Sequence, residues 1–271
     1  MRICVLAENT AVSEEFTAEY GLSLYIETAD GQKILFDMGQ TELFYKNAQT
    51  LGVDLAAVDI AILSHGHYDH GGGISTFLQI NETAPIYVHP LAFGDFYSGK
   101  EKYIGLDKST IGCGRLVFTD RETKLFDGIR ILAPREDELP FPKETYGLYM
   151  RNGDELIPDT FAHEQYLIIE DGNTKKVVSG CSHRGIASIS EYFDADVLIG
   201  GFHLKKLDVG NDSGVLSALA DNLLLQKTKY LTCHCTGEEQ YKYMKNRMGD
   251  RVTYVACGNT AEIEEKNYAK L

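Results

Sequence analysis

Short apolar runs separated by turn-forming residues recur along the first third of the chain. They predict five strands, at residues 3–7, 22–28, 33–37, 59–63 and 86–89, and the first few of these read as a β-meander. Asp30-Gly31 lies between the second and third runs and supplies the positive φ that a tight hairpin turn requires. Residues 41–51 place apolar side chains on one helical face, which predicts an amphipathic helix that ends at Gly52.

The second half of the chain shows the same alternation of strand and helix patterns. Strands are predicted at residues 166–170, 176–179, 197–199, 230–232 and 252–256, and helices at 186–193 and 213–227. Two similar halves of this kind predict an α/β fold in which two packed sheets carry outer helices. Residues that carry chemistry are then expected at the carboxyl ends of strands.

The middle of the chain, residues 91–159, differs from both halves. It holds four of the six prolines and many aromatic residues, which favours loops that cover a site. No repeat of fixed period and no low-complexity tract stands out. We therefore expect a single domain over residues 1–271, elaborated by a loop-rich, substrate-covering segment at about 91–159.

Composition and charge narrow the possible partners. Apolar residues make up 44% of the chain, so a sizeable core can be buried. The net charge of -14 and the pI near 5.0 disfavour nucleic acid and anionic membrane surfaces. We find no signal peptide and no apolar run of about 20 residues, and read the six scattered cysteines as reduced thiols. We expect a soluble, cytoplasmic protein with a small-molecule substrate, for which a homo-oligomer is possible.

The strongest chemical signal is the run His65-Gly66-His67-Tyr68-Asp69-His70, which follows the strand at 59–63. On an extended segment His65, His67 and Asp69 point the same way, and the next turn brings in His70. These ligands suffice for two divalent ions, with zinc as first choice and manganese or iron as alternatives. A merely polar loop is a poor explanation for four such groups beside Gly71-Gly72-Gly73, which we expect to form a sharp turn.

These motifs resemble those of a known family. HGHYDH is similar to the His-x-His-x-Asp-His signature of the metallo-β-lactamase superfamily, and Asp37 in LFDMGQ matches its upstream aspartate. The segments EYGLSLYIET, SGCSHRGI, GGFHL and HCTG resemble one branch more closely, the dihydropterin ribofuranosylaminobenzene-phosphate synthase-like proteins. The resemblance implies a four-layer αββα sandwich with a metal centre between the sheet edges.

The resemblance also implies a set of ligands. His65 and His67 would bind one metal, while Asp69 and His70 would bind the second, which His234 completes. Asp37 would orient a ligand histidine, since such a carboxylate fixes the tautomer of an imidazole. The alternative role for Asp37 is to begin the turn that follows it.

One position departs from the superfamily pattern. Cys181 stands where many of the hydrolases have a metal-bridging aspartate, so that Cys181 either ligates as a thiolate or is simply buried. His183 is our preferred imidazole ligand for the first metal, with His163 as its alternative. His203 in GGFHL is expected to contact substrate. Cys233-His234-Cys235 is a weak signal for a separate thiolate site, and of it we keep only His234.

Hydrolysis is the predicted chemistry. A metal-bound hydroxide would attack a small ester, lactone, amide or phosphodiester, and Asp69 would orient it as well as bind metal. One alternative is the branch's condensation of a pterin alcohol diphosphate with an aminobenzene ribose phosphate. An alternative of another class is a metal-binding sensor without turnover.

Overall fold

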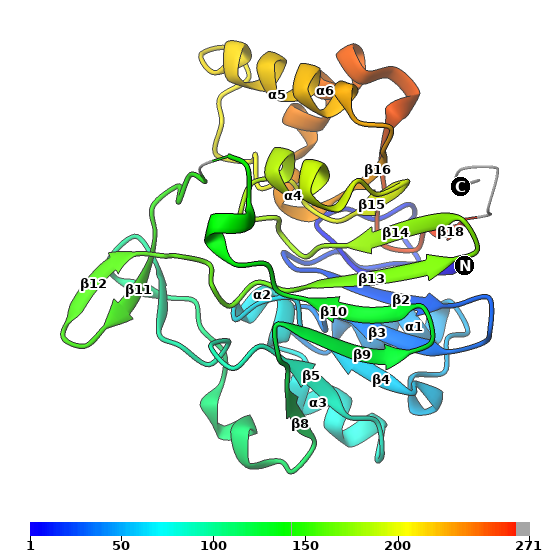
Figure 1. The fold of residues 1–271 in the computed structure, drawn as a ribbon. Helices are drawn as coiled ribbons and strands as arrows, with labels where there is room; N and C mark the ends of the chain where they lie inside the picture. Colours follow the sequence, from blue (N-terminus) through cyan, green and yellow to red (C-terminus); the bar gives the residue numbers. More distant parts are fainter. Residues whose placement is uncertain (142, 264–271) are drawn as a thin grey trace. The chain divides into compact units, whose positions relative to one another are not determined.

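The structure is a computed structural model that describes residues 1–141 and 143–263 (Figure 1). The chain folds into two compact units. The first comprises Met1–Asp120, Gly147–Gln165 and Ala256–Leu271, and the second comprises Arg121–Tyr146 and Tyr166–Val255. The single domain expected over residues 1–271 stays a prediction.

The first unit is built on a seven-stranded mixed sheet in the order β18-β1-β2-β3-β4-β5-β8. Its strands are β1 (Arg2–Ala7), β2 (Ser23–Glu27), β3 (Lys33–Phe36), β4 (Ile60–Ile62), β5 (Ile86–Val88), β8 (Leu116–Phe118) and β18 (Thr260–Glu262). The predicted β2–β3 hairpin is present, and its Gly31 has φ 85. From β3 to β8 the strands are parallel, so their carboxyl ends share one edge.

Helices cover one face of this sheet. α1 (Leu43–Thr50) and α3 (Ile74–Ile80) bury Phe44, Ala48 and Phe77 in one apolar cluster with sheet residues such as Leu35. The 3₁₀ turn η1 (Leu55–Ala57) packs against α3, and the short helix α2 (Tyr68–Gly71) follows β4. The histidine motif therefore lies where β4 ends and α2 begins.

The glycine triplet forms the expected turn into a helix, between α2 and α3, but without the positive φ that glycine adopts most readily. Gly72 and Gly73 have negative φ, -62 and -79, and belong to the caps of α2 and α3. A Cβ at Gly72 would overlap the carbonyl oxygen of Gln40, and one at Gly73 that of Met38. Glycine is needed here because two backbone segments approach closely, not because of its conformational freedom.

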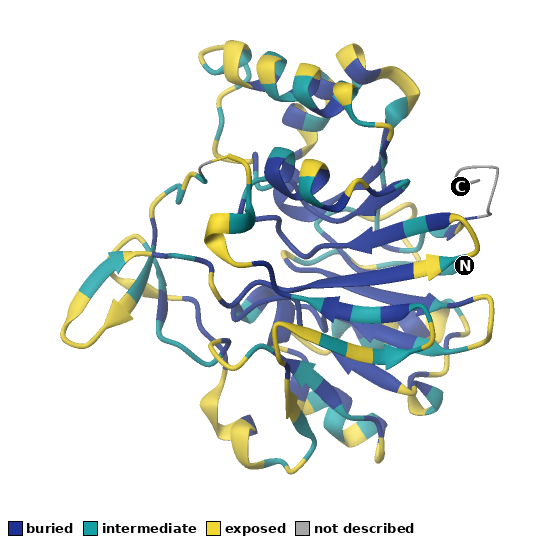
Figure 2. Cartoon of the chain, viewed as in Figure 1, coloured by how far each residue is buried: buried dark blue, intermediate teal, exposed yellow. Residues whose placement is uncertain are grey.

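The middle segment contains more strand than predicted. A four-stranded sheet in the first unit has the order β12-β11-β6-β7. Its strands are β6 (Phe96–Ser98), β7 (Lys102–Tyr103), β11 (Leu148–Asn152) and β12 (Glu155–Pro158), and the 3₁₀ turn η2 (Lys108–Gly112) follows β7. Figure 2 shows the tip of the β11–β12 hairpin exposed. β6 pairs with β11, which lies about fifty residues further along the chain, so the local pattern could not reveal this pairing.

The second unit is built on another seven-stranded sheet, in the order β17-β16-β15-β14-β13-β10-β9. Its strands are β9 (Glu122–Phe126), β10 (Ile129–Leu132), β13 (Tyr166–Asp171), β14 (Thr174–Val178), β15 (Val197–Ile199), β16 (Lys229–Thr232) and β17 (Val252–Tyr254). β14 to β17 are parallel, so their carboxyl ends also meet at one edge. The segments that follow β14, β15 and β16 carry the candidate residues of this unit.

Three helices pack on this second sheet, α4 (Ile186–Phe193), α5 (Ser213–Leu225) and α6 (Glu238–Met248), with 3₁₀ turns η3 (Glu136–Glu138), η4 (His234–Thr236) and η5 (Gly249–Arg251). α4 and α5 match the predicted helices, whereas α6 was not predicted. α6 buries only Gln240, Met244 and Met248, a stripe too narrow and too polar to stand out in the sequence. No helix within the described residues is long and apolar enough to cross a membrane.

Candidate metal centre

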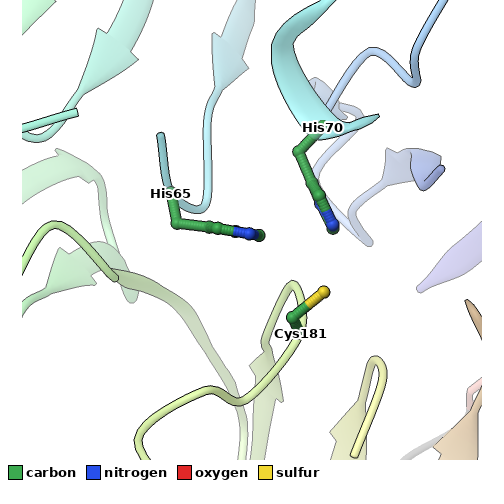
Figure 3. A group of neighbouring side chains, drawn as sticks. All are labelled: His65, His70 and Cys181. Carbon is green, nitrogen blue, oxygen red and sulfur yellow. The ribbon is translucent and has the colours of Figure 1, made fainter. Parts of the chain in front are cut away.

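The three motif histidines cluster at the carboxyl end of β4, as the sequence predicted. The centroids of the His65 and His67 rings lie 4.6 Å apart, and those of His65 and His70 lie 4.2 Å apart. In Figure 3 the His65 and His70 rings point toward the same space. The Asp69 carboxylate lies 3.9 Å from Nε2 of His70. All four side chains are buried, so a divalent cation placed here would be largely removed from water.

Asp37 organises this cluster from the end of β3. Its carboxylate accepts hydrogen bonds of 2.7 Å from the backbone N–H of Ser64, from the Ser64 hydroxyl and from Nδ1 of His70. Asp37 is fully buried and has φ 60, a left-handed conformation that aspartate tolerates better than most residues. The expected contact between Asp37 and a motif histidine is therefore present.

These hydrogen bonds assign the tautomers of two histidines. A carboxylate can only accept, so Nδ1 of His70 carries the proton. The Ser64 hydroxyl donates to Asp37, so its oxygen accepts from Nδ1 of His65 at 2.8 Å. In both rings the lone pair then lies on Nε2, the atom that a metal would bind.

A second carboxylate, Asp159, lies beside His67. Its Oδ2 is 3.7 Å from Nε2 of His67 and 3.3 Å from Nε2 of His163. The backbone N–H of Gly66 donates to Nδ1 of His163 at 3.0 Å, so the proton of this ring is on Nε2 and points at Asp159. Both nitrogens of His163 thus bond to protein groups, which favours a positioning role over the alternative that His163 is a ligand.

Burial and hydrogen bonding shift the pKa values of this pair. Burial lowers the pKa of His67, although the nearby Asp159 carboxylate opposes the shift. Burial raises the pKa of the Asp159 carboxyl, but its hydrogen bond with His163 and the nearby His67 ring lower it more, and the net pKa is well below its usual range. His67 is therefore favoured in the neutral form that metal binding requires.

The second unit brings together the remaining predicted residues. Cys181, also drawn in Figure 3, and His183 follow β14, while His203 follows β15 and His234 lies in η4. The ligand atoms of Cys181, His183 and His203 all lie within 4.8 Å of one another, as do those of Cys181, His234 and Cys235. Cys235 is not among the ligands predicted from the sequence, because one Cys-x-Cys is a weak signal.

The His203 ring is the most telling member of this group. Both of its nitrogens are buried, and neither has a hydrogen-bond partner in the described part of the chain. The His183 ring lies 4.2 Å from it, centroid to centroid. Buried polar atoms without partners are rare in folded proteins and call for a ligand or an ion. The donor set of imidazoles and thiols fits a divalent transition-metal ion.

Cys235 is held by backbone groups. Its Sγ accepts a hydrogen bond from the His203 N–H at 3.3 Å and donates to the Cys181 carbonyl at 3.5 Å. Burial raises the pKa of the Cys235 thiol, but contacts with the side chains of Cys181 and His203 and the nearby His234 lower it more, so its net pKa is well below the usual range. This environment favours a thiolate, in which the sulfur keeps the hydrogen bond from the His203 N–H and no longer donates to the Cys181 carbonyl.

A pocket of about 160 Å³ opens beside these residues in the second unit. His183 and His203 line it together with apolar side chains such as Leu204 and Val215, and one residue of each charge, Lys143 and Glu144, also lines it. A mostly apolar pocket with a few polar groups is typical of small-molecule sites.

Strand-end histidines, thiols and carboxylates of this kind define a candidate metal-binding α/β protein. Residues 16–221 match the metallo-beta-lactamase superfamily, and the chain belongs to this superfamily. The resemblance noted in the sequence and the fold class it implied are thereby confirmed.

The relatives of the chain are similar over nearly their whole length. The 7,8-dihydropterin-6-methyl-4-(beta-D-ribofuranosyl)-aminobenzene-5'-phosphate synthase of Methanocaldococcus jannaschii is 32% identical and covers 88% of each chain. The uncharacterized protein MJ0448 of the same organism is 30% identical over 87% of this chain and 90% of its own. The crystal structure of Tm1679, a metal-dependent hydrolase of the beta-lactamase superfamily, has a TM-score of 0.80 at 28% identity and covers 98% of this chain and 100% of that one.

Proposed function

We propose that the protein is a metal-dependent hydrolase that acts on a small ester, lactone, amide or phosphodiester. The observation that carries the proposal is the hydrogen-bonded unit of Asp37, Ser64, His65 and His70. In this unit the buried carboxylate of Asp37 fixes the tautomers of two imidazoles. Burying a carboxylate costs free energy of folding, and cation binding by Nε2 of His65 and His70 would offset that cost.

The ligand set proposed from the sequence motifs is retained. It comprises seven residues for two divalent ions, zinc first: His65, His67, Asp69, His70, Cys181, His183 and His234. The burial of all seven and the donor groups found within each unit support this assignment. Bound ions of this kind activate water near neutral pH and polarise the substrate.

The side chains around the proposed metal ions have distinct roles in this mechanism. Asp37 holds the proton of His70 on Nδ1, and Ser64 does the same for His65. Asp69 orients the attacking water with its carboxylate and accepts a proton from it. The pocket lined by His203 and by apolar side chains binds a substrate that has an apolar part.

A second candidate function is the condensation of a pterin with an aminobenzene ribose phosphate. It is favoured by the relative named as such a synthase, which is 32% identical over 88% of each chain. The same ligand set would serve this reaction, because a leaving diphosphate also requires a cation.

Turnover by metal-reconstituted protein tests the proposal. Zinc- and manganese-loaded protein is assayed separately on phosphodiester, lactone, thioester and β-lactam substrates. Hydrolysis that a chelator abolishes, and that His67→Ala lowers at least 100-fold, supports the hydrolase. His89→Ala is the matched control, since His89 lies outside the proposed ligand set and its Nδ1 accepts a hydrogen bond from the nearby N–H of Leu91. If no substrate of the panel is hydrolysed and the protein catalyses the pterin condensation, the synthase is supported. If neither activity is found in protein that has metal bound, the metal-binding sensor is supported.

A further inference from the structure

Three parallel strands of the second unit deliver thiol and imidazole donors to one sheet edge. β14 neighbours β15 and β15 neighbours β16, all in parallel register. Cys181 follows the first strand, His203 the second, and His234 with Cys235 the third. Neighbouring parallel strands carry their following segments to the same side, so this convergence is a property of the unit itself.

The distances among three of these donors suit one ion. Sγ of Cys181, Sγ of Cys235 and a ring nitrogen of His234 lie within 4.8 Å of one another, and Cys181 belongs to a second such group with His183 and His203. In a tetrahedral zinc site, with bonds of about 2.0–2.3 Å, ligand atoms are roughly 3.5–4 Å apart. Small movements of the side chains toward one another would bring the ligand atoms from within 4.8 Å to this spacing.

Gly201 provides the space that the Cys235 thiol occupies. A Cβ on Gly201 would overlap Sγ of Cys235, and Gly201 does not have the positive φ that would otherwise explain a glycine. The His203 N–H then donates to this sulfur at 3.3 Å. An amide hydrogen bond to sulfur is an outer-shell contact of the kind that orients metal-binding thiolates.

The backbone at these strand ends is held in an unusual conformation. Ser182, His203 and His234 have φ of 55, 55 and 52. A left-handed residue other than glycine costs about 1–3 kcal/mol and persists where the surrounding structure requires it, most often at functional sites. His203 combines this left-handed backbone conformation with a ring whose two buried nitrogens have no hydrogen-bond partner in the described residues.

We infer that Cys181 and Cys235 bind one metal ion as a thiolate pair, with His203 and His234 as its imidazole ligands. The inference rests on the proposed metal binding, adds Cys235 to the ligands, and makes His203 a ligand in place of the substrate contact that the proposed function gives it. Binding a divalent ion releases one proton from each of the two cysteines that is still a thiol, and no electrons are transferred. Two thiolates and two imidazoles select zinc, cobalt or iron over manganese and magnesium.

Cobalt substitution provides the first test. Co²⁺-loaded full-length protein is expected to show a near-ultraviolet thiolate-to-cobalt absorption band. Cys235→Ser and Cys181→Ser should each halve this band, whereas Cys257→Ser should leave it unchanged. Cys257 is a suitable control, because its buried thiol lies in the first unit and donates to the Glu8 carbonyl at 3.3 Å. His203→Ala should lower Co²⁺ affinity at least 10-fold, and Gly201→Ala should shift the band with every donor retained.

X-ray absorption on the zinc-loaded wild-type protein avoids any folding defect of the variants. With two zinc ions bound, the thiolate pair predicts an average of one sulfur per zinc at about 2.3 Å. An average of half a sulfur per zinc would mean that only one cysteine ligates, and this result would overturn the inference. A spectrum with nitrogen and oxygen scatterers and no sulfur would overturn it as well. In those cases bound zinc would still support the proposed function. Failure to bind Zn²⁺ or Co²⁺ at all would contradict both proposals.

Discussion

Replacing Asp37 by asparagine tests how the carboxylate prepares the histidine cluster. Asparagine has nearly the same shape and tolerates the left-handed backbone at φ 60, so the change alters hydrogen bonding with little strain. If the amide oxygen faces the Ser64 N–H, its NH₂ group faces Nδ1 of His70 and forces the proton of that ring onto Nε2. In the opposite orientation the NH₂ group faces the Ser64 N–H, and two donors oppose each other.

Either orientation has a cost that can be worked from the structure. The first removes the lone pair from the metal-facing nitrogen of His70, which predicts a loss of about 10- to 100-fold in metal affinity. This corresponds to about 1.4–2.7 kcal/mol. The second leaves a fully buried donor unsatisfied, which costs about 1–3 kcal/mol of folding stability.

Competition between the metal-free protein and a chromophoric chelator for Zn²⁺ measures the affinity, and urea unfolding measures the stability. Asp54→Asn is the control, because Asp54 is exposed and its carboxylate only caps η1 through the Ala56 N–H. Zinc affinity of Asp37→Asn equal to that of the wild type, in a folded protein, would refute the role given to Asp37.

The remaining predictions concern stability. Gly72→Ala should destabilise the first unit by about 1–3 kcal/mol in urea unfolding, because its Cβ would overlap the Gln40 carbonyl oxygen. Gly112→Ala should cost little, since its Cβ would meet no atom within 4 Å, and equal costs for the two would count against the close-approach argument. Leu216→Ala, in the core of α5, should lower stability by about 2–5 kcal/mol. Leu225→Ala, 81% exposed, should change it by less than about 0.5 kcal/mol, and a similar loss in both would contradict the packing described.

Elements with a strong local pattern could be predicted from the sequence. The helix predicted at residues 186–193 is α4 to the residue, and the strand at 197–199 is β15. α4 buries Ile186, Ile189 and Phe193 at helical spacing, and β15 buries three apolar residues in a row, so the hydrophobic pattern alone indicates both. α6 and the β6–β11 pair could not be found in this way, because one has a polar sequence and the other depends on a distant partner.

The candidate site was predicted only as far as its motifs extend. The histidine run and Asp37 were found because their spacing along the chain is distinctive. Asp159 follows β12 without any motif, and only the fold brings its carboxylate to His67 and His163. Cys235 was set aside because one neighbouring cysteine says little, whereas its contact with the Cys181 carbonyl joins segments more than fifty residues apart.

The metal content of the purified protein tests the central claim most directly. Elemental mass spectrometry on protein expressed in zinc-supplemented medium should find two zinc ions per chain in the wild type. His67→Ala should contain fewer, and His89→Ala should match the wild type. Wild-type protein that is folded and holds no metal above background, even after reconstitution, would contradict the account.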